Sequence, residues 1–194
     1  MKTRNLFAIT ALISGLCVSV NAQQMQGMQK HDMKGGMMGQ MEHMMPTKAI
    51  AVLFSAPDSK VQGTVTFEKV DGGIKVVADV TGLTPGKHGF HIHEYGDCSA
   101  SDFTSAGSHF MIDDEHHGAP GDAMSHKGDM GNLVADASGH AHLEWVDPEI
   151  SFMGPNSILG RGVIVHAGAD DLKTQPTGGA GARVACGVIG IAKQ

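Results

Sequence analysis

The stretch Gly89-Phe90-His91-Ile92-His93-Glu94 places two histidines two residues apart in a run that favours a β-strand. Residues two apart on a strand point to the same face of the sheet. His91 and His93 should therefore project from one face, while Phe90 and Ile92 project from the other. Two imidazoles that converge in this way are a suitable pair of ligands for copper or zinc.

A His-x-His pair is a weak signal by itself, because histidines on the exposed face of a strand have the same spacing. We interpret His140 and His142 as such a surface pair. His166 has a stronger context, since it ends the strand-like run Gly162–His166 and a ligand at the end of a strand is held rigidly.

Four further candidate ligands lie in one stretch, with spacings of eight, nine and three residues: His109, His117, His126 and Asp129. Turn-forming residues between them, including Gly118, Pro120 and Gly128, would let one loop wrap around an ion. Three imidazoles and one carboxylate suit tetrahedral zinc. His116 stands beside His117, and spacing alone leaves open which of the two binds.

The sequence from Thr47 onward has the pattern of an all-β domain. Apolar and polar residues alternate over 61–68 and over 74–80, on either side of the turn Asp71-Gly72-Gly73, which predicts a hairpin. Further strands are predicted at Ala49–Ser55, Gly86–Glu94, Ala141–Trp145, Gly162–His166 and Val184–Ile191. Many short strands with little helical periodicity predict an antiparallel sandwich or barrel.

Two long stretches interrupt the strands, Tyr95–Met130 and Ala167–Gly181. Both are rich in glycine, and the first contains the second group of candidate ligands. Loops of this length in a compact domain are usually functional.

The first 22 residues have the layout of a secretory signal peptide. Lys2 and Arg4 precede the apolar run Leu6–Val20, and small residues at 20–22 predict cleavage after Ala22. Cys17 follows Leu16, where a lipid-attachment site needs a small residue, so we do not expect a lipid anchor.

The chain has 14 Lys and Arg against 20 Asp and Glu; without Lys2 and Arg4 the balance is 12 against 20, a net charge of -8. This charge argues against a nucleic-acid partner.

Residues 23–46 form a separate segment before the strands begin. Eight of the 13 methionines lie between Met25 and Met45, together with His31 and His43. Without aromatic or β-branched residues, this composition predicts disorder in the absence of a ligand. Thioether sulfur favours Cu(I) and imidazole also binds copper, so we expect residues 25–45 to capture copper ions. The alternative is a linker of biased composition.

Two cysteines remain after removal of the signal peptide, Cys98 and Cys186. An even number in an exported protein predicts a disulfide. A bridge across 88 residues would stabilise the fold by roughly 4–5 kcal/mol in the chain-entropy model.

Several motifs together resemble the copper,zinc superoxide dismutase family, in its bacterial exported form. They are Gly89–Glu94, Gly107-Ser108-His109-Phe110, Gly128-Asp129-Met130-Gly131-Asn132 and Gly187-Val188-Ile189-Gly190-Ile191. The resemblance covers about residues 50–194 and implies a superoxide dismutase domain over 47–194. The fold it implies is an all-β, eight-stranded Greek-key β-barrel of the immunoglobulin-like sandwich type, with two long functional loops.

The resemblance also implies the ligand sets. Copper would be held by His91, His93, His109 and His166. Zinc would be held by His109, His117, His126 and Asp129, with the deprotonated ring of His109 bridging both ions. His117 rather than His116 fits the family spacing before Gly118-Ala119-Pro120.

Other roles follow from the same resemblance. Asp170, rather than its neighbour Asp171, resembles a carboxylate that joins a copper ligand to a zinc ligand and fixes their ring orientation. Arg183 matches an arginine beside the copper, where it would guide superoxide into an acidic protein. Cys98 and Cys186 resemble the bridge that ties the long loop to the barrel and so holds Arg183 in place.

The expected function is the dismutation of superoxide to dioxygen and hydrogen peroxide by redox-cycling copper, with His109 also supplying a proton. The expected location is the periplasm. The competing hypothesis is an exported protein of the same fold that only binds or buffers copper. Bacterial relatives are monomers or dimers, so a homodimer is one of the two assemblies considered.

Overall fold

The computed structural model describes residues 45–194. The expected signal peptide, 1–22, and all but the last two residues of the Met/His-rich segment, 23–46, lie outside this range. The strands are β1 (Lys48–Ser55), β2 (Gln62–Val70), β3 (Gly73–Thr81), β4 (Gly86–His93), β5 (Asp129–Ala135), β6 (Ala141–Asp147), β7 (Gly162–His166), β8 (Arg183–Val188) and β9 (Gly190–Ile191). One short 3-10 helix, η2 (Thr104–Ala106), precedes the candidate ligand His109.

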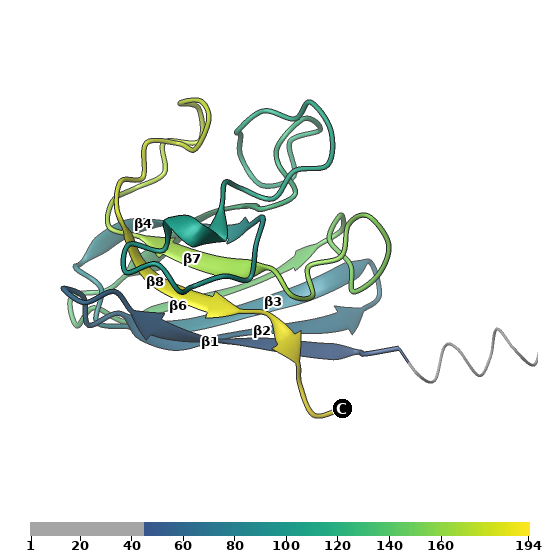
Figure 1. The fold of residues 1–194 in the computed structure, drawn as a ribbon, viewed down its shortest axis with the longest axis horizontal. Coiled ribbons are helices and arrows are strands. Elements are labelled where there is room, and N and C mark those ends of the chain that lie inside the picture. The colour runs from purple at the N-terminus through teal and green to yellow at the C-terminus, as the bar shows by residue number, and fades with distance from the viewer. Residues whose placement is uncertain (1–44) are drawn as a thin grey trace, which may run out of the picture. The chain divides into compact units, whose positions relative to one another are not determined.

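The strands form an antiparallel sheet in the order β5-β4-β7-β8-β1-β2-β3-β6, and β9 pairs with β1. β4 lies beside β7, and β3 beside β6, although neither pair is consecutive in the chain. These connections give a Greek key. The two ends of the order, β5 and β6, also lie next to each other, so the sheet is nearly closed (Figure 1). The expected all-β, eight-stranded Greek-key barrel is confirmed.

The hairpin of β2 and β3 follows the predicted alternation. Val65 and Phe67 on β2, and Val76 on β3, are at most 1% exposed, while the residues between them are polar or only partly buried. Each fully buried apolar side chain of this size stabilises the fold by about 1.5–3 kcal/mol. Gly72 has a φ of 91°, a left-handed conformation that favours glycine at the turn between the two strands.

The alternating pattern did not reveal β5, which lies inside and just beyond the stretch interpreted as a loop. Gly131 and Asn132 are poor strand formers, and neighbouring residues show no alternation. β5 forms because it pairs with β4 from Gly86↔Ala135 to His91↔Asp129. This pairing places Asp129 directly opposite His91, so the missed strand carries one of the candidate ligands.

Two long connections project from the same side of the barrel, between β4 and β5 and between β7 and β8 (Figure 1). Cys98, in the first, forms a disulfide with Cys186 on β8, with a Cα–Cα distance of 5.9 Å. The expected disulfide is confirmed, and it ties the first connection to the barrel. Within residues 45–194, no helix has the length and apolar character needed to cross a membrane.

Candidate metal centre

β4 directs apolar and imidazole side chains to opposite faces. Phe90 and Ile92 belong to the hydrophobic core, and both are fully buried. His91 and His93 are also fully buried, but they contact other histidine rings instead. The core packing of Phe90 and Ile92 therefore fixes the direction in which the two imidazoles point.

Two other histidines join this pair from different parts of the chain. His166 ends β7, which pairs with β4, and its ring centroid lies 5.0 Å from that of His91. His109 forms an isolated β-bridge with His93, which brings its ring to 3.9 Å from that of His91. The pairing of β4 with both neighbours thus assembles four buried imidazoles.

Each of the four rings has one nitrogen engaged with an oxygen acceptor. His91 Nε2 donates to Asp170 Oδ2 at 2.7 Å, and His109 Nδ1 donates to Asp129 Oδ1 at 2.7 Å. His93 Nδ1 and His166 Nδ1 donate to the carbonyl oxygens of Gly107 and Gly181, at 3.0 and 2.9 Å.

The second nitrogen of each ring has no hydrogen-bond partner within the described residues, although it is buried: His91 Nδ1, His93 Nε2, His109 Nε2 and His166 Nε2. Because the first nitrogen carries the proton, the second presents a lone pair. One nitrogen from each ring lies within 4.8 Å of the others. A buried polar atom normally has a partner, so four converging lone pairs fit a metal ion with nitrogen ligands.

A second group shares His109 and is centred on Asp129. Oδ1 of Asp129 lies 2.7, 3.0 and 3.3 Å from Nδ1 of His109, His117 and His126. Oδ2 accepts from the backbone N–H groups of Gly118 and His126 at 3.0 and 3.1 Å, which orients the carboxylate. Three imidazoles and one carboxylate, all buried, match the ligand set of tetrahedral zinc.

Of the histidines His116, His117, His140 and His142, only His117 is buried in a candidate metal-binding group. His117 is buried in the second group, whereas His116 is exposed and pairs through its backbone with the Ser125 segment. His142 Nδ1 contacts Asp79 Oδ1 at 2.8 Å on the exposed side of β6 and β3, and His140 is also exposed. Neither of these two lies in a metal-binding group identified within residues 45–194.

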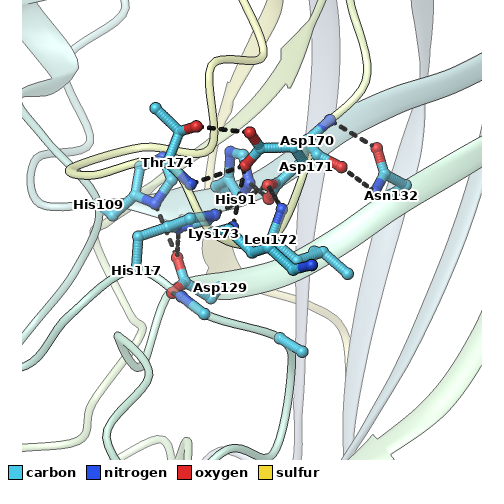
Figure 2. Close-up of polar contacts among 12 residues, drawn as sticks. His91, His109, His117, Asp129, Asn132, Asp170, Asp171, Leu172, Lys173 and Thr174 are labelled. Carbon is cyan, nitrogen blue, oxygen red and sulfur yellow. Dashed lines mark hydrogen bonds and ion pairs between the residues drawn. The ribbon is translucent and has the colours of Figure 1, made fainter.

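Asp170 connects the two groups (Figure 2). Its Oδ2 accepts from His91 Nε2 at 2.7 Å, and its Oδ1 accepts from His117 Nε2 at 2.8 Å. Asp171 instead is exposed and accepts from the backbone of Lys173 and Thr174. One carboxylate therefore sets the ring orientation and the tautomer of a residue in each group.

Asn132, which belongs to the Gly128–Asn132 motif, holds Asp170 in place. Its Nδ2 donates to the carbonyl oxygen of Asp170 at 2.9 Å, and its Oδ1 accepts from the Asp170 N–H at 2.8 Å. The two residues are 38 positions apart. Since Asn132 is in the unrecognised strand β5, only its place in the Gly-Asn motif could have suggested its importance.

Arg183 begins β8, where it pairs with His166, one of the four histidines, on β7. Its Nη1 and Nη2 donate to the carbonyl oxygens of Phe103 and Gly107, at 2.6 and 2.7 Å. Gly107 O also accepts from His93 Nδ1, so the guanidinium and this imidazole share one backbone anchor. Arg183 places a positive charge beside a buried group that has the lone pairs of a metal site.

Burial keeps the histidines of the first group neutral. Burial lowers the pKa of His91 to about 3 and the pKa of His166 to about 4. Burial also lowers the pKa of His93 well below its usual range, and the nearby charges of His109 and Arg183 act in the same direction. For Asp129, burial alone would raise the pKa, but hydrogen bonds from His109 and His126 outweigh it and the pKa is lowered. Neutral imidazoles and an ionised carboxylate are the forms that bind metal ions.

Removal of the metals should leave a protein that loses stability as the pH falls below about 6.5. In the folded state His91 takes up a proton only near pH 3, and His166 near pH 4, whereas the ordinary value is 6.5. Between these values the unfolded chain binds more protons, so acid favours unfolding. Urea unfolding of chelator-treated protein from pH 8 to pH 4 would measure this loss. A His140→Ala/His142→Ala variant should show the same pH dependence, and stability that stays constant down to pH 5 would contradict the prediction.

Comparison with known proteins agrees with this geometry. The family model described as copper/zinc superoxide dismutase (SODC) matches residues 61–189. An extracellular Cu-Zn superoxide dismutase from Brugia pahangi is 44% identical over 152 residues, which is 74% of this chain and 75% of that relative. A crystal structure of the clock protein EA4 is similar with a TM-score of 0.70 and 44% identity, over 76% of this chain and 96% of that one. The chain therefore belongs to the copper/zinc superoxide dismutase family, whose enzymes use copper and zinc as cofactors and superoxide as substrate.

Proposed function

We propose that this chain dismutes superoxide to dioxygen and hydrogen peroxide with both metals bound at the two groups described above. Copper would be held by His91, His93, His109 and His166, and zinc by His109, His117, His126 and Asp129. The observation that carries this proposal is that His109 belongs to both groups, with one ring nitrogen directed to each. Its Nδ1 faces Asp129 in the second group, and its Nε2 belongs to the converging lone pairs of the first.

The donor atoms suit the two metals differently. Four imidazole nitrogens without a carboxylate suit copper, and three imidazoles with a carboxylate suit zinc. When bound, copper supplies the one-electron redox chemistry and zinc stays in one oxidation state. Every other requirement falls on the residues of the chain: binding the anion, holding the rings in place and supplying protons.

Arg183 would bind the superoxide anion. The chain is acidic, with 20 Asp and Glu against 14 Lys and Arg, so a negatively charged substrate needs a local positive charge. One N–H of Nη1 and one N–H of Nη2 anchor the guanidinium to the carbonyl oxygens of Phe103 and Gly107, and its remaining N–H groups stay available to an anion. The fork of donors also orients a small anion, which a lysine would do less well.

His109 would carry one of the two protons that convert superoxide to hydrogen peroxide. Its Nδ1 is engaged with Asp129, so a proton that enters or leaves this ring does so at Nε2. Two superoxide ions and two protons give one dioxygen and one hydrogen peroxide, and water supplies the second proton. Asp170 holds His91 and His117 in fixed orientations while this proton moves.

Metal content and superoxide consumption, measured on the same preparations, test this function. The wild-type protein should bind one copper and one zinc per chain and consume superoxide. His109→Ala removes the shared ligand, so it should lower the affinity for both metals and abolish most activity. Arg183→Ala should keep both metals and lose roughly 1.5–3 kcal/mol of anion binding, about tenfold to a hundredfold in kcat/KM.

The competing hypothesis, a copper-binding or buffering protein of the same fold, makes a different prediction for the wild type. Both metals would be bound without consumption of superoxide, and Arg183→Ala would change nothing that can be measured. This pair of results would contradict the enzymatic proposal.

The Met/His-rich segment supports a second proposal, that residues 25–45 capture copper ions for the enzyme. The support is compositional: eight of 13 methionines and two histidines lie within 25–45. Soft thioether ligands favour Cu(I), and a tethered segment raises the local copper concentration. All of these residues except Met45 lie outside the part that the structure describes.

Copper loading under limiting copper tests this role of the segment. We expect the mature full-length protein to load copper faster than a variant that starts at Pro46, because the variant lacks the tethered thioether ligands. A variant with leucine in place of the methionines from Met25 to Met45 keeps the length and should behave like the truncated protein. Equal loading of all three proteins would contradict the proposal.

We also propose export to the periplasm. The support is the layout of residues 1–22, the disulfide between Cys98 and Cys186, and the name of the Brugia pahangi relative, which is extracellular.

A homodimer is the assembly that an exposed apolar patch on neighbouring strands favours. Val52 on β1 is 61% exposed and Ile191 on β9 is 66% exposed, with Phe54 and Val188 also exposed beside them. β1 pairs with both β8 and β9, so these side chains lie on adjacent strands. A second copy related by a two-fold axis would present the same patch and cover it.

Sedimentation equilibrium tests this assembly. We expect a dimer for the wild type and a monomer for Val52→Lys/Ile191→Lys, because the buried charges would oppose contact. Val134→Lys, at an exposed valine on β5, is the matched control and should remain dimeric. A wild-type monomer at concentrations up to 100 μM would contradict the proposal.

A further inference from the structure

Gln175 contacts the backbone of the candidate zinc ligand His117, although the two residues are 58 positions apart. Its Oε1 accepts from the His117 N–H at 2.9 Å, and its Nε2 donates to the His117 carbonyl oxygen at 2.8 Å. One carboxamide thus pairs with both polar backbone groups of a single residue. This is the same arrangement by which Asn132 holds Asp170.

We propose that Gln175 is a positioning residue for zinc, which holds His117 with its imidazole directed into the zinc-binding group. This inference deepens the proposed function, since it rests on His117 being a zinc ligand. The amide acts as a neighbouring strand would act, by pairing with the N–H and the C=O of one residue. It therefore fixes the backbone direction at His117, and the direction of the side chain follows from it.

The surrounding chain explains why such a contact is needed. Residues 111–114 are exposed and belong to no strand, so they do not hold His117 from the N-terminal side. His116 is paired through its N–H with Met124 O at 2.8 Å, on the opposite strand-like segment. Adjacent residues of an extended chain point to opposite sides, so fixing this segment with His117 inward leaves His116 outward and exposed.

The segment that carries Gln175 is itself held by hydrogen bonds (Figure 2). Asp171 Oδ1 accepts from the N–H groups of Lys173 and Thr174 at 2.9 and 2.8 Å. Gly178 N–H donates to Thr174 O at 2.7 Å, and Asp171 N–H donates to Gly178 O at 3.0 Å. Gln175 therefore extends from a closed turn whose geometry is set within the segment 171–178.

The same turn reaches the imidazole of His117 as well as its backbone. Asp170 Oδ1 accepts from His117 Nε2 at 2.8 Å. Gly178 has a φ of 70° and packs so closely that a Cβ there would collide with Asp170 Oδ1 and with His117 Nε2. The segment 170–178 thus fixes one ligand from two directions: Asp170 and Gly178 at the ring, and Gln175 at the backbone.

Zinc affinity, measured by competition with a chelator on the full-length protein, tests the role of Gln175. Gln175→Ala removes both hydrogen bonds, and we expect zinc to dissociate about tenfold or more readily, a typical effect of losing a contact that orients a ligand. Gln175→Glu keeps an acceptor for the His117 N–H but places an oxygen against the carbonyl, so it should also weaken zinc. The affinity for copper should change less than threefold, because His117 is outside the four-histidine group.

Gln194→Ala is the matched control. Gln194 is also exposed, and its amide contacts the backbone of Thr47 and Lys48 at 2.6 and 3.2 Å, but at the start of β1 and not at either candidate metal-binding group. The Gln194→Ala substitution removes hydrogen bonds of the same kind and should leave the affinity for zinc unchanged. The visible spectrum of Co(II) bound in place of zinc gives a second readout, which should change for Gln175→Ala and not for Gln194→Ala.

The possible results separate this inference from the proposed function. Equal zinc affinity and equal Co(II) spectra for wild type and Gln175→Ala would contradict the role of Gln175 alone. An equal loss of affinity in Gln175→Ala and Gln194→Ala would also contradict it, because the effect would then be general destabilisation. A wild-type protein that binds no zinc would instead contradict the zinc site on which the inference rests.

Discussion

The candidate metal centre depends on one constraint: in each of its four buried imidazoles, one nitrogen is held by a hydrogen bond to an oxygen of the protein. Asp170, Asp129 and the carbonyl oxygens of Gly107 and Gly181 each accept a hydrogen bond from one of the four rings. The other nitrogen of each ring must then present its lone pair to the common centre. Burial lowers the pKa of these histidines and keeps them neutral, so the site is prepared for metal ions by the same packing that forms the barrel.

The barrel and the loops contribute in different ways to this centre. β4 and β7 supply His91, His93 and His166 from hydrogen-bonded strands, where the core packing of Phe90 and Ile92 fixes their directions. The proposed zinc-binding group comes mainly from a loop, which has no row of strand-to-strand hydrogen bonds to hold it. In this loop, hydrogen bonds from side chains take the place of strand pairing, because carboxylate and carboxamide groups bond to the rings and the backbone of the candidate ligands and their neighbours.

The disulfide and Arg183 belong to the same structural unit. Cys186 lies three residues after Arg183 on β8, and Cys98 lies in the connection that contains Phe103 and Gly107. The bridge therefore holds the two carbonyl groups that anchor the guanidinium close to the strand that carries it. A cation kept in this position can serve an anionic substrate even though the chain as a whole is acidic.

The sequence alone determined the fold class, the family and the grouping of candidate ligands, because alternation and local motifs are properties of neighbouring residues. The period of two over β2 and β3 follows from the pleat of a strand, and His91 with His93 is a local pattern of the same kind. Tertiary structure alone decided the position of β5, in which Gly131 and Asn132 carry no strand pattern and which forms by pairing with β4. It also decided that His117 is buried while His116 is exposed, and it revealed the contacts of Gln175 and Asn132. These contacts join residues 38 to 58 positions apart, and no local pattern in a sequence encodes which distant backbone a side-chain amide will meet.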